Sequence, residues 1–170
     1  MLRPQRRSLE GIRSVRAGNG IARLSPMAGF CDFQEIVAWR LARGVKIKVD
    51  HFLERPEAAR RFKFRDQLSD AARSAPRNIA EGFGRFKHKE FAQFVRIAKG
   101  SLVEVLNHLI DASDQRLLSR GEFLLLEHEI ERALKAANGL IRYLETTPDV
   151  PPPPQRPKRT DDSGIGSDGV

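Results

Sequence analysis

The sequence predicts an all-α protein, built as an antiparallel up-down four-helix bundle with disordered N- and C-terminal tails. Three observations predict this fold. Four segments between residues 32 and 146 repeat apolar residues at steps of three and four, the period of one buried helix face. Two of the segments open with helix-capping patterns, and the joins between segments are short. A chain of 170 residues has room for one such domain.

The first helix is predicted to begin at Asp32, which precedes Glu35 by three residues, the spacing of a capping box. It should end before Pro56, since proline cannot continue a helix from within. The face expected to be buried consists of Phe33, Ile36, Val37, Leu41, Val45, Val49 and Phe52.

The second helix is predicted to begin at Pro56, because the first turn of a helix does not need the missing N–H. Pro76 interrupts its middle, and an interior proline costs about 3 kcal/mol. The apolar pattern keeps its phase across Pro76, so we expect one kinked but continuous helix. Its core face consists of Phe64, Leu68, Ala71, Ala75, Ile79 and Phe83.

Gly82 and Gly84 are expected to cap and turn the chain into a third helix. Gly100 and Ser101 lie inside that helix, where small residues predict a close approach of the Ala71–Ala75 turn. The core face of the third helix consists of Phe91, Phe94, Val95, Ala98, Leu102, Val105, Leu106 and Leu109.

A second capping box, Ser119 with Glu122, predicts the start of the fourth helix. Its apolar residues follow heptad spacing: Phe123, Leu126, Ile130, Leu134, Ala137, Ile141 and Leu144.

Outside residues 32–146 the composition changes. Residues 1–31 have no helical period and many glycines, and they read as a flexible basic tail. An alternative is that translation starts at Met27, downstream of this arginine-rich stretch. Residues 147–170 contain the Pro151–Pro154 run and a Gly/Ser/Asp end, which predicts a disordered proline-rich tail.

Charge and cysteine content narrow the possible functions. The chain carries 30 Lys+Arg against 22 Asp+Glu, a net charge of +8 that favours polyanionic partners. Residues 55–99 hold 12 basic and five acidic residues, a net charge of +7. Cys31 is the single cysteine, which predicts no intrachain disulfide and a reducing, cytoplasmic location. No apolar run approaches 18 residues, so we expect no membrane association.

Patterns for catalysis, metals and cofactors are almost entirely missing. No histidine has a glutamate three residues before it, and no His-Glu-x-x-His occurs. The G-x-G-x-x-G match at residues 164–169 is followed only by Val170, so no helix could hold a pyrophosphate. We therefore expect no enzyme activity, cofactor, metal or small-molecule substrate. His108 with Glu104 and Asp111 on one helix face leaves a residual enzyme hypothesis, although a solvated polar face explains these residues more simply.

Two short motifs are specific: Asn-Ile-Ala-Glu-Gly at residues 78–82 and Ala-x-Gly-Ser-Leu at residues 98–102. In these motifs the chain resembles the four-helix-bundle proteins encoded in intervening sequences of bacterial 23S rRNA genes, over residues 33 to 145. The resemblance implies a homopentamer without enzymatic activity. A more distant relative is a nucleic-acid-binding accessory protein of diversity-generating retroelements. The chain departs from the family pattern at Asp70, where a basic residue is expected, and at Ala75, where a branched residue is expected.

The motif residues form polar stripes beside the apolar faces of the second and third helices. We expect the stripes to hydrogen-bond to one another or to a neighbouring subunit and so to fix register, with ligand binding as the alternative. These residues are Ser74, Pro76, Asn78, Glu81, Gly82, Gly100, Ser101 and Glu104.

The basic residues of the second helix and the start of the third are the candidate nucleic-acid site. They are Arg60, Arg61, Lys63, Arg65, Arg73, Arg77, Arg85, Lys87, Lys89, Arg96 and Lys99. They predict contacts to RNA or DNA phosphates with little sequence preference, although they could also be mere solvated surface. Aromatic residues that could stack on bases are not expected among them, since the nearby phenylalanines mostly fall on core faces. The alternative function is a protein–protein interaction scaffold without nucleic-acid binding.

Overall fold

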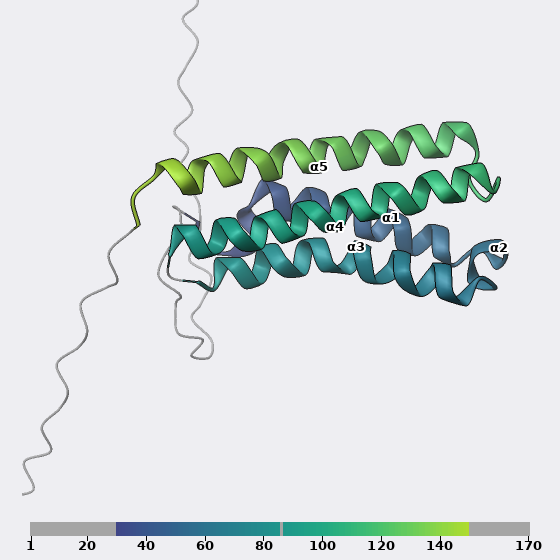
Figure 1. Cartoon of the computed structure of the whole chain (residues 1–170), viewed down its shortest axis with the longest axis horizontal. Coiled ribbons are helices and arrows are strands. Elements are labelled where there is room, and N and C mark those ends of the chain that lie inside the picture. The colour runs from purple at the N-terminus through teal and green to yellow at the C-terminus, as the bar shows by residue number, and fades with distance from the viewer. Residues whose placement is uncertain (1–29, 86, 150–170) are drawn as a thin grey trace, which may run out of the picture.

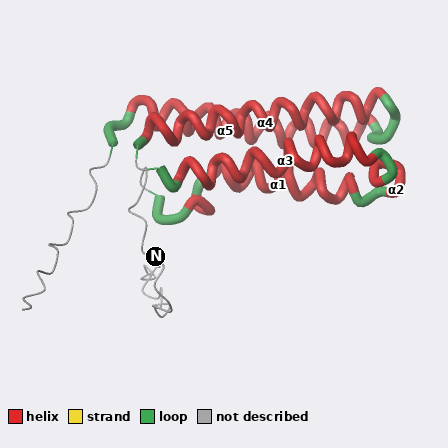
Figure 2. The backbone as a smooth tube through the Cα atoms, turned by 60° about the horizontal axis from the view of Figure 1, so that its bottom comes forward, coloured by secondary structure: helices red, strands yellow, loops and turns green. Residues whose placement is uncertain are grey.

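The computed structural model describes residues 30–85 and 87–149, and all regular structure among them is helical (Figure 1). The all-α prediction is therefore confirmed. Four long helices lie side by side, and one single-turn helix sits at an end of the molecule (Figures 1 and 2). In chain order, the elements are a 3-10 turn η1 (Phe33–Glu35), α1 (Val37–Leu53), α2 (Pro56–Ala59), α3 (Phe62–Phe83), α4 (His88–Asp114) and α5 (Arg120–Thr146).

Each long helix packs against two others. α3 contacts α1 and α4, and α5 contacts the same two helices on its own side. The end of α1 lies beside the start of α5, where Arg55 pairs with Glu122. The start of α4 lies beside the end of α5, where the His88 N–H donates to Asp149 at 2.7 Å. Polar contacts thus fix both ends of α5.

The core is one continuous cluster of apolar side chains, to which every long helix contributes one face. Its largest fully buried members include Leu68, Ile79, Phe91, Leu102 and Ile130. Alanines fill many of the remaining positions, which allows the helices to approach closely.

The first helix begins later than predicted. The Asp32 carboxylate accepts from the Gln34 N–H at 2.8 Å, and Glu35 accepts from the Cys31 N–H at 3.0 Å. These bonds close the single 3-10 turn η1, after which Ile36 is extended and α1 starts at Val37. The break changes the helical phase, so Val37, predicted to be in the core, is exposed.

The second predicted helix is two helices in the structure. Arg60 and Arg61 separate α2 from α3. Arg60 still has helical dihedral angles, and the chain leaves helical geometry at Arg61. We call Arg55–Arg65 the elbow. α3 then runs without interruption through Pro76, as predicted, and the adjacent side chains Ala72, Ala75 and Ile79 are buried. This burial offsets the hydrogen bond that proline cannot make.

The two motif glycines have different environments. A Cβ on Gly82 would lie 2.5 Å from Cδ2 of Phe91 and 2.7 Å from Cβ of Phe94, so this glycine allows α3 and α4 to approach closely. Of the two glycines predicted to cap and turn the chain, Gly84 is the C-cap of α3, whereas Gly82 is the penultimate residue of that helix. The close approach predicted at Gly100 is wrong, since a Cβ there would meet nothing within 4 Å.

The two predicted tails, the start at Met27 and the glycine pattern at residues 164–169 lie almost wholly outside the described residues. None of the described helices is both long enough and apolar enough to span a lipid bilayer.

Candidate nucleic-acid interface

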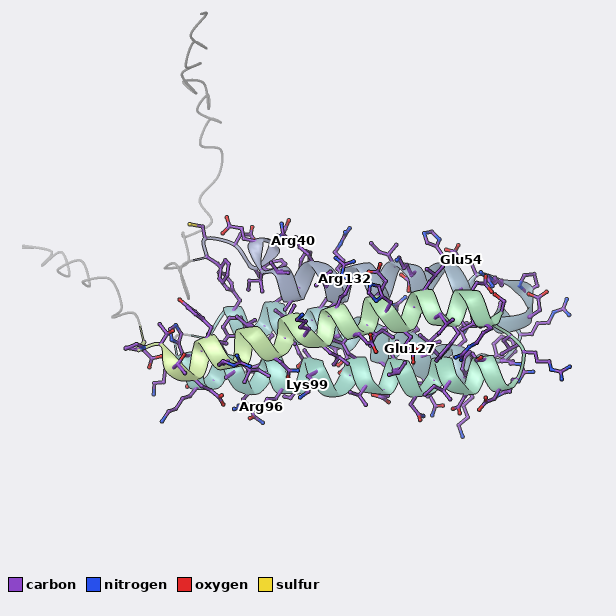
Figure 3. The ribbon with its side chains drawn as sticks, turned by 90° about the horizontal axis from the view of Figure 1, so that it is seen from above. Arg40, Glu54, Arg96, Lys99, Glu127 and Arg132 are labelled. Atoms are coloured by element: carbon purple, nitrogen blue, oxygen red, sulfur yellow. The ribbon has the colours of Figure 1, made fainter. Side chains whose placement is uncertain are left out.

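The eleven basic residues predicted to bind phosphates do not form one patch. Arg60, Arg61, Lys63 and Arg65 lie at the elbow, whereas Arg85, Lys87 and Lys89 lie at the turn between α3 and α4. The 22 residues of α3 separate these two groups by about 30 Å, at about 1.5 Å per residue. The other four lie within the long helices, Arg73 and Arg77 on α3 and Arg96 and Lys99 on α4. Figure 3 labels Arg96 and Lys99.

Four of the eleven basic side chains already contact another side chain of the same protein. Arg65 pairs with Asp66 at 2.9 Å, Arg85 pairs with Glu81 at 2.9 Å, and Arg96 pairs with Glu145. Arg61 donates a hydrogen bond to the side chain of Gln115. The other seven make no ion pair with any residue that the structure describes: Arg60, Lys63, Arg73, Arg77, Lys87, Lys89 and Lys99.

The exposed side of α3 carries both signs of charge. Asp66, Asp70, Arg73, Arg77 and Glu81 follow one another at steps of three and four, so they share one face of the helix, and all five are exposed. Acidic neighbours one turn away lower the local potential that a phosphate would meet. The net positive charge of this region is therefore concentrated at the two ends of α3.

At the α3–α4 end, an acidic residue sits among the basic ones. Besides accepting from the His88 N–H, Asp149 lies 3.8 Å from Nδ1 of His88, and that Nδ1 contacts the Thr147 carbonyl at 2.9 Å. The Asp149 carboxylate therefore occupies the N-terminus of α4, where a phosphate would otherwise be attracted. This leaves the elbow as the stronger candidate for phosphate contacts.

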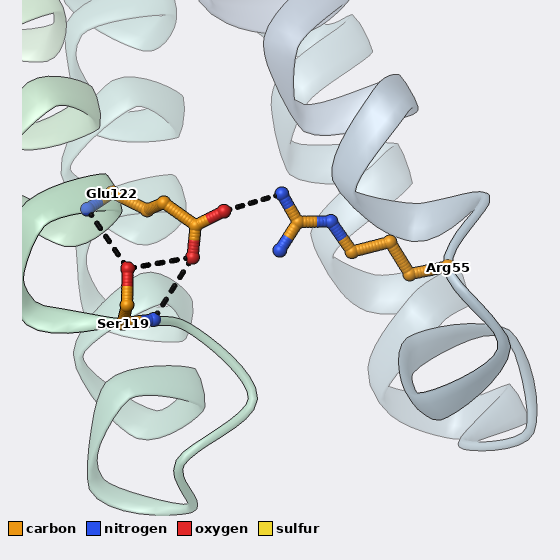
Figure 4. Close-up of polar contacts among 3 residues, drawn as sticks. All are labelled: Arg55, Ser119 and Glu122. Carbon is orange, nitrogen blue, oxygen red and sulfur yellow. Dashed lines mark hydrogen bonds and ion pairs between the residues drawn. The ribbon is translucent and has the colours of Figure 1, made fainter.

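The elbow is held in place from both sides. Arg55 Nη2 lies 2.6 Å from Glu122 Oε1, and Glu122 forms the predicted capping box with Ser119 (Figure 4). The hydrogen bond from Arg55 is the main cause that lowers the pKa of Glu122 to about 2, and the Ser119 N–H and hydroxyl add to it. The same contact raises the pKa of Arg55. Arg61 ties the other side of the elbow to Gln115, directly after α4.

Sequence reasoning missed one residue at the elbow. Phe62 is 67% exposed, and the guanidinium carbon of Arg65 lies 5.4 Å from its ring centroid. Its neighbours Arg61 and Lys63 are also exposed. The expectation that no aromatic side chain accompanies the basic residues is therefore wrong at this position. The sequence could have shown that Phe62 lies outside the core face, because it precedes the core position Phe64 by two residues and residues two apart on a helix do not share a face.

Three of the motif residues form a polar contact between α3 and α4. Asn78 Nδ2 donates to the carbonyl and the hydroxyl of Ser74 at 2.8 and 3.0 Å, and the Ser101 hydroxyl lies 2.8 Å from that of Ser74. Asn78 and Ser101 are buried. Glu81 pairs with Arg85, one turn away, and Glu104 is exposed without an ion pair to a described residue. Ser74, Asn78 and Ser101 thus form a polar contact between the two helices.

The residual enzyme hypothesis concerns three residues of α4, His108, Glu104 and Asp111. His108 is half-buried with its ring centroid 6.1 Å from that of Phe64, while Glu104 and Asp111 are exposed. Among residues 30–85 and 87–149, no three His, Cys, Asp or Glu side chains are grouped so that they could hold a metal ion.

Comparison with known proteins adds one finding. The family model of the 23S rRNA-intervening sequence protein matches residues 34–139, well over half of the chain. The chain belongs to this family. The predicted resemblance to this family is thereby confirmed. The matched residues include both motifs, the elbow and all eleven basic residues. No curated protein matches the chain.

Proposed function

We propose that the protein is a non-enzymatic homo-oligomer that binds RNA or DNA through backbone phosphates, with little sequence preference. The observation that carries this proposal is the elbow, where Arg60 and Lys63 are exposed and lack acidic partners among the described residues. Such cations release counterions when they meet a polyanion, which gives affinity without sequence selection. The family description concerns sequences that intervene in 23S rRNA, so a 23S rRNA fragment is the first ligand to test.

The scaffold in this proposal is an antiparallel up-down four-helix bundle. The Arg55–Glu122 and His88–Asp149 contacts support it, because each joins the end of one helix to the start of its neighbour. The exposed, lone Cys31 fits a reducing compartment, and we place the protein in the cytoplasm.

The second candidate function is a protein-interaction scaffold without nucleic-acid binding. The seam between α1 and α5 favours it. Two hollows of about 270 and 250 Å³ lie along this seam, one bordered by Val37 and Ala136 and the other by Phe52 and Leu125. Val37 and Leu125 are exposed apolar residues, which suits a contact between protein chains. The homopentamer implied by the family resemblance could use this seam and multiply a weak phosphate site through avidity.

Three measurements test these proposals. Binding of RNA and DNA oligonucleotides should weaken steeply with salt, with log K falling by several units per unit of log salt concentration if about five phosphates are contacted. No binding at about 50 mM salt, or a flat response, would contradict nucleic-acid binding. Light-scattering mass reports self-association in the same samples. Protein partners that remain bound after nuclease treatment would favour the scaffold.

A further inference from the structure

Phe62 is unusual among the phenylalanines of this chain. It is 67% exposed, whereas every other phenylalanine that the structure describes is buried or half-buried. A ring in solvent contributes little to folding, because the stabilisation from an apolar side chain scales with the area removed from water. Its nearest described ring contact is with the guanidinium of Arg65. The packing of the core therefore gives no reason for an aromatic residue at this position.

The surroundings of Phe62 are strongly basic. The elbow, residues 55–65, contains five basic residues and one acidic residue, Glu57. Arg65 balances part of its charge against Asp66, and Arg61 is held by Gln115. Arg60 and Lys63, on either side of Phe62 in sequence, have no acidic partner among the described residues and remain available. The first turn of α3 also has no acidic residue, and its N-cap residue makes no side-chain cap hydrogen bond.

An exposed ring beside unpaired cations matches a ligand that combines a flat apolar face with a negative charge. Nucleotides have this combination, since a base can stack on the ring while adjacent phosphates meet the cations. The bases of a duplex are already paired and stacked, so they cannot stack on Phe62 without being unpaired first. A stacking site of this kind would therefore favour single strands over duplexes.

We propose that the elbow is a single-strand binding site in which Phe62 stacks on an unpaired base while Arg60 and Lys63 bind the neighbouring phosphates. This inference rests on the proposed nucleic-acid binding and makes it more specific. It assigns affinity for phosphates to the cations and preference for unpaired bases to the ring.

The test compares single-stranded and duplex RNA of equal length, using the full chain and its Phe62→Ala variant. Stacking on an aromatic side chain is worth about 1–3 kcal/mol per base, which converts to an affinity loss of about 5- to 150-fold for the single strand. Duplex affinity should stay unchanged, and so should the salt dependence, because Phe62 carries no charge. A 2-aminopurine base in the single strand should change its fluorescence on binding the wild type and much less on binding the variant.

Two further variants act as controls. Phe62→Trp keeps a ring and should preserve single-strand binding. Val103→Ala shortens an exposed side chain of α4, at 50%, that has no ring and lies outside both the elbow and the α1–α5 seam, and it should change neither affinity nor fluorescence. Circular dichroism should show all three variants folded, because neither exposed side chain belongs to the core.

The outcomes separate this inference from the function on which it rests. Salt-dependent binding of both RNA forms that Phe62→Ala leaves unchanged would overturn the stacking site and keep the proposed phosphate binding. If Phe62→Ala lowered the mass of the oligomer and left the RNA affinity per subunit unchanged, Phe62 would belong to a contact between copies of the chain. That result would also overturn the stacking site. A wild type that binds no RNA at low salt would overturn both proposals.

Discussion

The Arg55 guanidinium lies 2.6 Å from the Glu122 carboxylate, across 67 residues of sequence, and joins the elbow to the first turn of α5. The Glu122 carboxylate also accepts from the Ser119 N–H at 3.0 Å and from the Ser119 hydroxyl at 2.8 Å, and the Glu122 N–H donates to that hydroxyl at 3.3 Å. The Glu122 carboxylate therefore caps the start of α5 and also holds the elbow, the candidate site, in position. Its ionisation should be visible in the stability of the whole protein.

Acid should weaken this contact. Because the pKa of Glu122 falls from its usual 4.5 to about 2 on folding, its stabilising effect is complete above about pH 5 and is lost progressively as the pH drops toward 2. The two side chains are 43% and 39% exposed, so solvent screening limits the ion pair to about 1 kcal/mol or less. Urea unfolding of the wild type and of Glu122→Gln at pH 7 and pH 3 measures this. The variant should be the less stable protein at pH 7, and the difference should shrink at pH 3. A difference independent of pH would contradict the assignment.

Gly82→Ala and Gly100→Ala should have opposite effects, although both replace a helical motif glycine. The Gly82 variant places a methyl group against Phe91 and Phe94, an overpacking that typically costs about 1–3 kcal/mol. The Gly100 variant meets no neighbour and should gain up to about 1 kcal/mol of helix propensity. Urea unfolding of both variants tests this. Equal losses of stability would show that Gly100 is also in a close contact.

Ser74 and Ser101 should be energetically coupled. Their hydroxyl groups lie 2.8 Å apart between α3 and α4, and Ser74 also accepts from Asn78. A buried hydrogen bond contributes about 0.5–1.5 kcal/mol, so each alanine variant should lose about that amount. The double variant should lose clearly less than the two single losses together, because the second change removes a partner already lost. Strictly additive losses would show that the bond between the two hydroxyls contributes nothing.

Asp149 should stabilise the first turn of α4 from outside the helix. Asp149→Ala removes the acceptor of the His88 N–H, a loss comparable to that of an N-cap residue at about 0.5–2 kcal/mol. Asp149→Asn keeps an oxygen acceptor and should recover much of the loss. Amide exchange at His88, followed by NMR, reports this bond directly. Unchanged protection in Asp149→Ala would contradict it.

The fold was predictable where the local sequence pattern matches the packing of the core. Each error in the prediction has a physical cause. The Ser119–Glu122 capping box is formed as predicted. The heptad spacing expected for α5 drifts because a straight helix has 3.6 residues per turn, so Ala133 and Leu140 are buried where Leu134 and Ile141 were expected. The break at Arg60–Arg61 could not be predicted, because neither arginine disfavours a helix and the Arg61–Gln115 contact is visible only in three dimensions.

The candidate site was predictable only in part. Sequence identified which residues are basic but not how they divide between the two ends of α3. The acidic residues along α3 were visible in the sequence at Asp66, Asp70 and Glu81, whereas the approach of Asp149 to α4 depends on the path of the chain after α5. Phe62 was overlooked because apolar residues near a core stripe are usually assigned to the core.

The salt dependence of RNA binding by two paired variants tests the central claim most directly. Arg60→Gln with Lys63→Gln removes the unpaired charges of the elbow, and Arg73→Gln with Arg77→Gln removes two charges from the mixed face of α3. If the elbow binds phosphates, the first pair should reduce the slope of log K against log salt concentration by about 1.4–1.8, since each phosphate contact contributes about 0.7–0.9. The second pair should change the slope much less. Equal reductions by both pairs, or a wild-type slope near zero, would contradict the account.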